Sequence, residues 1–189
     1  MPNWCNNSIT IQGPTETVKT LWEEAKTADN GSFGLLNAMV PMPKELEDTQ
    51  GMSDGPNWYQ WRVNNWGTKW DISDEGLEFT DNGDGTSSIT GWFDSAWSPP
   101  IEAYNTWLDD NDNCSLYATY EEGGMDFAGI YDDGYDEYME GVNEWSLSVL
   151  RGTCALEDTP ELFQKLDNEM DLVEARSYLL DDEEEVTVQ

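Results

Sequence analysis

Residues 77–93 read LEFTDNGDGTSSITGWF, two runs of strand-forming side chains on either side of Asp81-Asn82-Gly83-Asp84-Gly85. Asn-Gly and Asp-Gly pairs tolerate the positive φ angles that tight hairpin turns require. We therefore expect Leu77–Thr80 and Ser87–Phe93 to pair as antiparallel strands. This hairpin is the centre from which the rest of the fold can be traced in both directions.

Upstream of the hairpin, polar and apolar residues alternate over Asn6–Gln12, which indicates a half-buried strand. Phe33–Val40 is interpreted as a second strand, ended by Pro41 and Pro43 because proline cannot donate to a strand ladder. Between these two segments, apolar residues recur at i, i+3, i+4 and i+7, which predicts a helix to about residue 28. They are Val18, Leu21, Trp22 and Ala25.

Immediately before the hairpin, WYQWRVNNWGTKWD at 58–71 favours one or two short helical turns. After it, Pro99-Pro100 precedes an amphipathic helix carrying Ile101, Tyr104, Trp107 and Leu108. Ser115–Tyr120 and Phe127–Tyr131 are separated by Glu121-Glu122-Gly123-Gly124, which predicts a second hairpin.

Helices that interleave with hairpins indicate an α+β sandwich, a mainly antiparallel sheet with helices on one face. We expect this domain to span residues 1–142, with an inserted aromatic-rich segment at about 47–72. Residues 143–189 are expected to form an acidic C-terminal extension, with an amphipathic helix at 160–180 and a disordered tail. That helix either packs on its own domain or docks a partner, for example a second copy in a homodimer.

Five motifs follow one another along the chain: PNWCNN at 2–7, VPMPKEL at 40–46, NWGTKWD at 65–71, FDSAWSPP at 93–100 and YEEGGMDFAG at 120–129. Together they resemble the YubB-type phage and plasmid proteins, which are related to Api-type phage proteins. The resemblance implies a ferredoxin-like fold and a mobile-element origin. That family has no established activity or ligand, so the resemblance assigns no functional residue.

Composition narrows the classes of function. The 189 residues contain no histidine, which excludes a Ser-His-Asp triad, a histidine proton shuttle and any zinc site that needs imidazole. The 8 basic and 40 acidic residues give a net charge of −32, which disfavours direct binding of nucleic acid. Phosphate-binding and dinucleotide-binding loops are also missing, and both aspartate-glycine turns lack the side-chain oxygens of a calcium loop. We therefore expect no enzyme, no cofactor and no metal site.

Location is also an expectation from the sequence. The N-terminus lacks a basic segment followed by an apolar one, and no apolar run approaches the roughly 20 residues that span a bilayer. Cys5, Cys114 and Cys154 are odd in number and form no Cys-x-x-Cys pair, so a disulfide framework is not expected. We expect a cytoplasmic protein, in the host cytoplasm if it is phage-encoded, that does not bind membranes.

The acidity is uneven, since residues 70–150 contain 20 acids and no Lys or Arg. Three explanations stay open: mimicry of DNA, adaptation to a salty cytoplasm, and a solvated surface without a partner. Mimicry is plausible in magnitude because 32 net charges equal those of about 16 base pairs. The candidate partner-binding acids are Asp109, Asp110, Asp112, Glu121, Glu122, Asp126, Asp132, Asp133, Asp136, Glu137, Glu140 and Glu144.

The aromatic segment has two interpretations. Its rings either fill the core or form a stacking platform for a nucleotide or sugar, with two cations holding an anionic group. The candidate ligand-binding residues are Trp58, Trp61, Arg62, Trp66, Lys69, Trp70 and Trp97.

From sequence, the leading hypothesis is therefore a non-catalytic acidic protein of phage or plasmid type. It would bind a basic host protein of nucleic-acid processing or defence, as a DNA mimic or anti-defence inhibitor. The alternative is a small-ligand binding module that uses the Trp58–Trp70 cluster.

Overall fold

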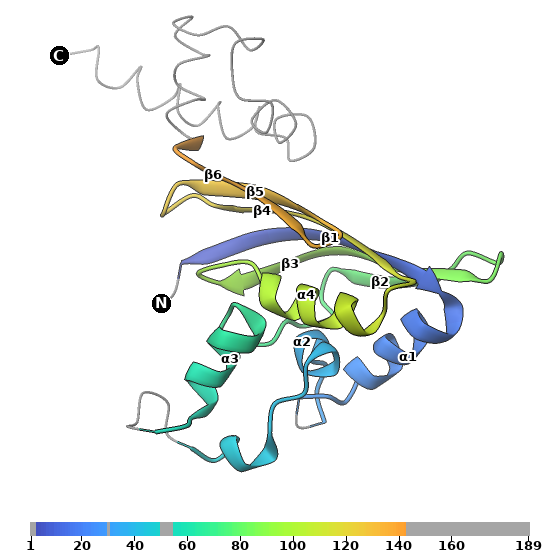
Figure 1. The fold of residues 1–189 in the computed structure, drawn as a ribbon, viewed down its shortest axis with the longest axis horizontal. Helices are drawn as coiled ribbons and strands as arrows, with labels where there is room; N and C mark the ends of the chain where they lie inside the picture. The colour runs from blue at the N-terminus through green and yellow to red at the C-terminus, as the bar shows by residue number, and fades with distance from the viewer. Residues whose placement is uncertain (1–2, 30, 50–54, 143–189) are drawn as a thin grey trace, which may run out of the picture.

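The computed structural model describes residues 3–29, 31–49 and 55–142, and its core is a six-stranded antiparallel sheet with helices on one face (Figure 1). The strands are β1 (Trp4–Pro14), β2 (Leu77–Asp81), β3 (Thr86–Ala96), β4 (Ser115–Glu122), β5 (Phe127–Asp132) and β6 (Tyr135–Glu140). The helices are α1 (Thr15–Ala25), α2 (Leu35–Met39), η1 (Lys44–Leu46), α3 (Trp58–Trp66) and α4 (Ile101–Asp110).

The strand order β2-β3-β1-β4-β5-β6 contains a ferredoxin-like sheet. In β1-α1…β2 and in β3-α4-β4, a helix-containing connection joins two strands that are separated by one antiparallel neighbour, the split βαβ arrangement. β5 and β6 extend this sheet beyond β4. The predicted α+β sandwich with helices on one face is confirmed.

Strand alternation decides which side chains face the helices. In β1, the odd-numbered Cys5, Asn7, Ile9 and Ile11 are buried, whereas the even-numbered residues are exposed on the opposite face. Ile89 of β3 and Leu116 of β4 lie opposite Ile11 and join the same core. We call the face of the sheet that points away from the helices the open face.

One predicted element differs from the structure, and one observed strand was not predicted. Phe33–Val40 was interpreted as a strand, and this is wrong because Leu35–Met39 forms α2. The Asp71 carboxylate explains the difference, since it accepts hydrogen bonds from the Leu36 and Asn37 amides at the start of that helix. β6 was not predicted at all, while the segment predicted as a helix at 160–180 lies outside the described residues.

The structure describes two of the three cysteines, Cys5 and Cys114, and both are free thiols. Cys5 is fully buried, and this burial raises the pKa of its thiol to about 12. Cys114 is half-buried, and burial raises its pKa as well. A thiol that stays protonated near neutral pH is a poor nucleophile. Cys154 lies outside the described residues.

Candidate functional site

Helix α3 places most of the predicted aromatic cluster against the core. Its N-cap is Asn57, whose side chain accepts a hydrogen bond from the Gln60 amide, and its C-cap is Gly67 in the left-handed conformation. Trp66 is 0% exposed and its Nε1 donates to the Val40 carbonyl at 2.8 Å. The prediction that Trp66 stacks on a ligand is therefore wrong, because this ring is enclosed by protein.

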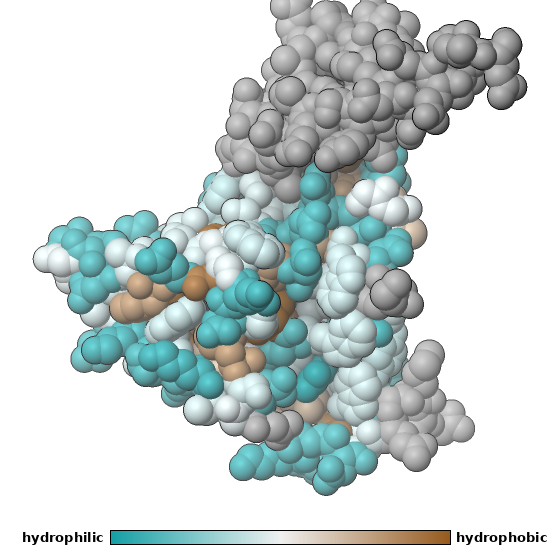
Figure 2. Space-filling model, turned by 180° about the vertical axis from the view of Figure 1, so that it is seen from behind, coloured by the Kyte–Doolittle hydropathy of each residue, from teal (hydrophilic) through white to brown (hydrophobic). Residues whose placement is uncertain are grey.

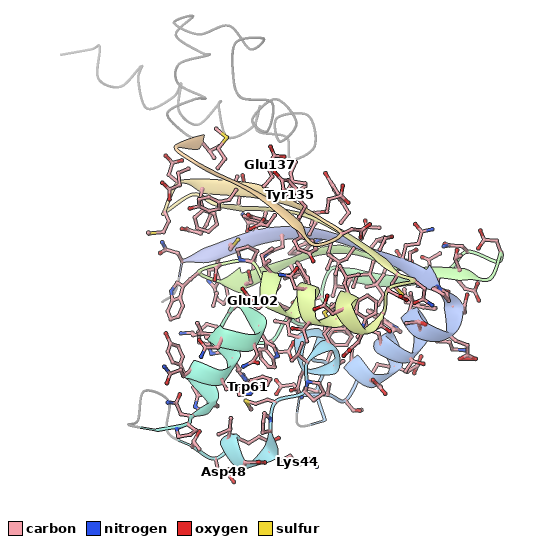
Figure 3. The ribbon with its side chains drawn as sticks, viewed as in Figure 1. Lys44, Asp48, Trp61, Glu102, Tyr135 and Glu137 are labelled. Carbon is pink, nitrogen blue, oxygen red and sulfur yellow. The ribbon has the colours of Figure 1, made fainter. Side chains whose placement is uncertain are left out.

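Trp58 and Trp61 also belong mainly to the core. Both are half-buried and pack against the buried cluster, and Trp61 meets Trp66 edge to face at 5.9 Å. Figure 3 shows Trp61 on α3, on the helical side of the sheet. Core packing, the alternative weighed for this segment, describes these three residues.

The two cations of the segment already have aromatic partners. The Arg62 guanidinium lies 4.7 Å from the Trp66 ring centroid and 5.5 Å from that of Trp58, and it approaches Asp29 at 3.9 Å. Lys69 Nζ lies 3.8 Å from the Trp70 ring centroid and 4.3 Å from that of Trp97. These contacts are cation–π interactions, so neither cation is held ready for an anionic ligand.

Trp70 and Trp97 are the predicted site residues that do reach the surface, with 37% and 41% exposure. Trp97 has a φ of 73°, and its amide donates to the Asn3 carbonyl at 3.0 Å. A positive φ is costly for a residue with a side chain, so the surrounding contacts must hold it there.

Two further exposed tryptophans line a cleft together with Trp70 and were not among the predicted site residues. Trp4 is 46% exposed and its ring meets that of Trp70 at 5.7 Å, while Trp92 is 61% exposed. Both lie on the open face, Trp4 at the start of β1 and Trp92 in β3. Extending the alternation of Asn6–Gln12 back to Trp4 would have placed it on the exposed side.

Trp4, Trp70 and Trp92 line a cleft of about 420 Å³, which we call the tryptophan cleft. Asp94 and Glu75 contribute exposed carboxylates to its lining. A second hollow of about 360 Å³ shares Trp92 and Asp94 and continues across the open face. Its other lining residues are Asn6, Asn7, Ser8, Phe93 and Thr119.

Five of the six described strands place a carboxylate on the open face, although the register also puts the buried apolar residues Ala128, Ile130 and Met139 there. Register places Asn6 directly between Asp94 of β3 and Glu121 of β4, and places Glu137 and Asp132 further along the same face. Burial raises the pKa of Glu121, an effect that a hydrogen bond with Asn6 opposes. None of the six strands that the structure describes contains a Lys or Arg.

The twelve predicted partner-binding acids do not share one surface. Glu121, Asp132 and Glu137 lie on the open face, and Figure 3 shows Glu137 with Tyr135 on the side away from the helices. Asp109, Asp112 and Asp133 surround a hollow of about 300 Å³ at the end of α4, beside Asp110, the last residue of that helix. Asp126, Asp136 and Glu140 occupy the β4–β5 turn and the opposite side of β6, and Glu144 lies outside the described residues.

Glu122 has a structural role instead of a free carboxylate. It is 3% exposed and accepts hydrogen bonds from the Gly124 amide at 2.8 Å and the Met125 amide at 2.6 Å. These bonds close the β4–β5 turn. The prediction that Glu122 meets a partner is therefore wrong, because its carboxylate is enclosed and used.

Asp71 lines the tryptophan cleft but is turned toward backbone amides. Its Oδ1 accepts from the Leu36 and Ile72 amides, both at 2.8 Å, and its Oδ2 accepts from the Asn37 amide at 2.9 Å. Burial, helped by the nearby charge of Asp29, nevertheless raises the pKa of this carboxyl to about 6. Asp71 thus ties α2 to the segment between α3 and β2.

Two kinds of feature, a metal-binding cluster and a membrane-spanning helix, are not found within the described ranges. No three His, Cys, Asp or Glu side chains there gather so that they could hold a metal ion. In the same part of the chain, no helix is both long and apolar enough to cross a membrane.

Comparisons with known proteins add little to this picture. No protein-family model matches the chain, and no curated protein is significantly similar to it. Among solved structures, the crystal structure of protein api92 from Yersinia pseudotuberculosis is a weak neighbour, with 18% identity and a TM-score of 0.39. The match covers 56% of this chain and 39% of the Yersinia chain.

Proposed function

We propose that this chain is a non-catalytic binding protein whose partner is a basic protein, and that the open face of the sheet meets that partner. One observation carries the proposal: the six described strands contain no Lys or Arg, yet the open face combines carboxylates with exposed aromatic rings. The carboxylates on that face are Glu78, Asp94, Glu121, Asp132 and Glu137.

Charge complementarity selects the chemistry of the partner. An open sheet face with aromatic residues on its central strands can stack nucleic-acid bases, but here phosphates would meet Asp94 and Glu121. A basic surface would gain from the same carboxylates, and long-range attraction would speed its encounter. Proteins that handle nucleic acids carry such basic surfaces. The partner is accordingly a nucleic-acid-processing or defence protein, met in place of DNA.

The mobile-element setting rests on the five sequence motifs at 2–7, 40–46, 65–71, 93–100 and 120–129. A phage or plasmid protein gains if it blocks a host protein that acts on DNA. This setting agrees with an inhibitor that mimics DNA but does not identify its target.

The test is affinity capture from a nuclease-treated host lysate, with matched charge variants. Wild type should retain a nucleic-acid-processing protein at low salt, and duplex DNA or about 0.5 M salt should release it. The open-face variant D132K/E137K should lose that protein, because both substitutions reverse charges on the proposed surface.

The control variant is E24K/E45K, which makes the same charge change at exposed positions on α1 and η1, on the helical side. It should retain the protein as wild type does. Equal loss in both variants would contradict the proposal, since binding would then follow net charge. Full retention in both variants would contradict it as well, since binding would then use another surface.

The exposed tryptophans favour one alternative, a small-ligand module. Trp4, Trp70 and Trp92 could stack on a flat ligand, and the surrounding carboxylates make a sugar more suitable than a nucleotide. A change in tryptophan fluorescence with a sugar, unaffected by salt, would support this alternative.

A further inference from the structure

We infer that the tryptophan cleft accepts an arginine side chain from the partner, as the anchor of the interface. This inference rests on the proposed function and names the group that the cleft recognises. It is carried by the exposed indoles of the cleft, by the sign of the charge on its lining and by an internal contact of the same chemistry.

The walls of the cleft are unusual for a surface. Trp4, Trp70 and Trp92 leave 46%, 37% and 61% of their area exposed, although indoles gain much from burial. Tryptophan and arginine are the residue types that dominate binding energy at the centre of protein interfaces. Three exposed indoles around one cleft of about 420 Å³ therefore indicate a recognition site.

The charge on the lining selects a cation. Glu75 and Asp94 are exposed there, whereas the Asp71 carboxylate is already occupied by three backbone amides. No Lys or Arg is among the residues that line the cleft. An anionic ligand would be repelled, and a neutral ligand would leave the two exposed carboxylates unused.

Lys69 shows that one ring of the cleft, that of Trp70, already contacts a cation. Its Nζ lies 3.8 Å from the Trp70 centroid and 4.3 Å from the Trp97 centroid, within the distance of a strong cation–π contact. Arginine suits the neighbouring cleft better than lysine does. Its planar guanidinium stacks on an indole and can also bond a carboxylate such as Asp94 through two parallel N–H groups.

The cleft is built in advance, which lowers the cost of binding. Gly76, with a φ of +102°, lets the backbone approach the Trp92 ring, and a Cβ there would meet that indole at 2.9 Å. The Trp92 amide also donates to the Gly76 carbonyl at 3.1 Å. The backbone below the ring thus fixes the Trp92 wall.

The probe for the test is the tripeptide acetyl-Gly-Arg-Gly-amide, with citrulline and lysine versions as controls. Citrulline keeps the shape of arginine but replaces the guanidinium by a neutral urea. The readout is the NMR signals of the indole N–H groups in the folded, full-length chain. The arginine peptide should shift the Trp4, Trp70 and Trp92 signals saturably, while those of buried Trp66 and Trp107 stay in place.

Citrulline should bind about tenfold more weakly than arginine, and W92A and D94N should weaken arginine binding by a similar factor. W92F separates charge recognition from packing, because a smaller ring keeps part of the cation–π contact. The E24K/E45K variant is the control that should bind normally. Circular dichroism confirms that each variant is folded.

Equal binding of arginine and citrulline, or binding of an oligosaccharide at the same indoles, would overturn the inference. If the arginine peptide does not bind, the inference is wrong. The proposed function would still stand if D132K/E137K loses the captured protein. Peptide binding without any captured basic protein would instead refute the proposed function and keep the cleft as an arginine site.

Discussion

At the residue scale, Asp71 shows how one buried carboxylate joins segments that are distant in sequence. It accepts hydrogen bonds from Leu36 and Asn37, 35 and 34 residues away, and from its neighbour Ile72. Burial still outweighs these bonds and raises the pKa of Asp71 to about 6. Ionisation of Asp71 is therefore less favourable in the folded protein than in the unfolded chain.

This balance predicts a pH dependence. The folded pKa of about 6 lies above the ordinary value of 3.8, so the folded state binds the proton more tightly. Relative to D71N, wild type should be most stable below about pH 4 and lose on the order of 2–3 kcal/mol by pH 7. Urea unfolding of both proteins at several pH values measures this difference.

D71N is the suitable reference because its amide does not titrate, and its altered hydrogen bonds cost the same at every pH. The repulsion among the other carboxylates is common to both proteins and cancels in the comparison. A constant difference between the two unfolding free energies from pH 4 to pH 7 would contradict the raised pKa.

At the scale of elements, Gly91 allows the backbone of β3 to approach the segment before β2 closely. It has a φ of +142° in β3, and a Cβ there would collide with the Gly76 carbonyl. Gly91 also pairs with both Leu77 and Ile9, so a displacement would disturb two strand pairs. The backbone at this point tolerates only glycine.

G91A should therefore lower the free energy of unfolding by more than about 2 kcal/mol. G85A is the matched control, since Gly85 also has a positive φ of +94° but nothing within 4 Å of its added Cβ. It should cost only about 1 kcal/mol. Similar losses in urea unfolding of the two variants would show that the close approach to Gly76 is unimportant.

The sequence predicted correctly those helices and strands that are determined by residues within or next to them. The turn at Asp81–Gly85 identified the β2–β3 hairpin, and helical spacing identified α1 and α4. The strand predicted at Phe33–Val40 is a helix because its cap, Asp71, is remote in sequence and enters only through the tertiary fold. β6 escaped prediction because half of YDEYME is acidic, and Asp and Glu are depleted in strands.

Only part of the candidate site could be predicted from the sequence, for the same reason. Sequence clustering found Trp70 and Trp97. Trp4 and Trp92, which line the same cleft as Trp70, come from separate strands and reach it only in the folded protein. Density of tryptophan in the sequence also suggested Trp66, whose burial depends on packing against Val40 and the core. The acids were chosen by charge alone, which could not tell exposed Asp132 from structural Glu122.

At the scale of the whole molecule, the negative charge has opposite effects on stability and on binding. Repulsion among the carboxylates weakens the folded state, whereas their attraction for a basic partner strengthens the complex. The chain carries a net charge of −32, and among the described residues two ion pairs form, Lys26–Glu23 and Arg62–Asp29. Hydrophilic residues cover most of the surface seen in Figure 2, with hydrophobic residues in small separate patches. Self-repulsion should therefore weaken the folded state when salt is low.

Raising salt from about 0.02 to 0.5 M should increase the free energy of unfolding, because screening reduces this repulsion. The same salt should weaken binding of the basic partner, because screening also reduces attraction. Urea unfolding and capture in matched buffers measure both quantities. Salt that leaves stability unchanged while it abolishes binding would show that repulsion within the fold is already relieved.

The most direct test of the central claim maps where a cationic chain touches the protein. An octa-arginine peptide is titrated at low salt into the isotopically labelled full-length chain, and backbone NMR shifts are followed. The largest shifts should fall on the open-face residues of β1, β3 and β4, around Asn6, Asp94 and Glu121, and D132K/E137K should reduce them. Shifts centred on α1 and α4, or spread evenly over every acidic residue, would contradict the claim that the open face is the binding surface.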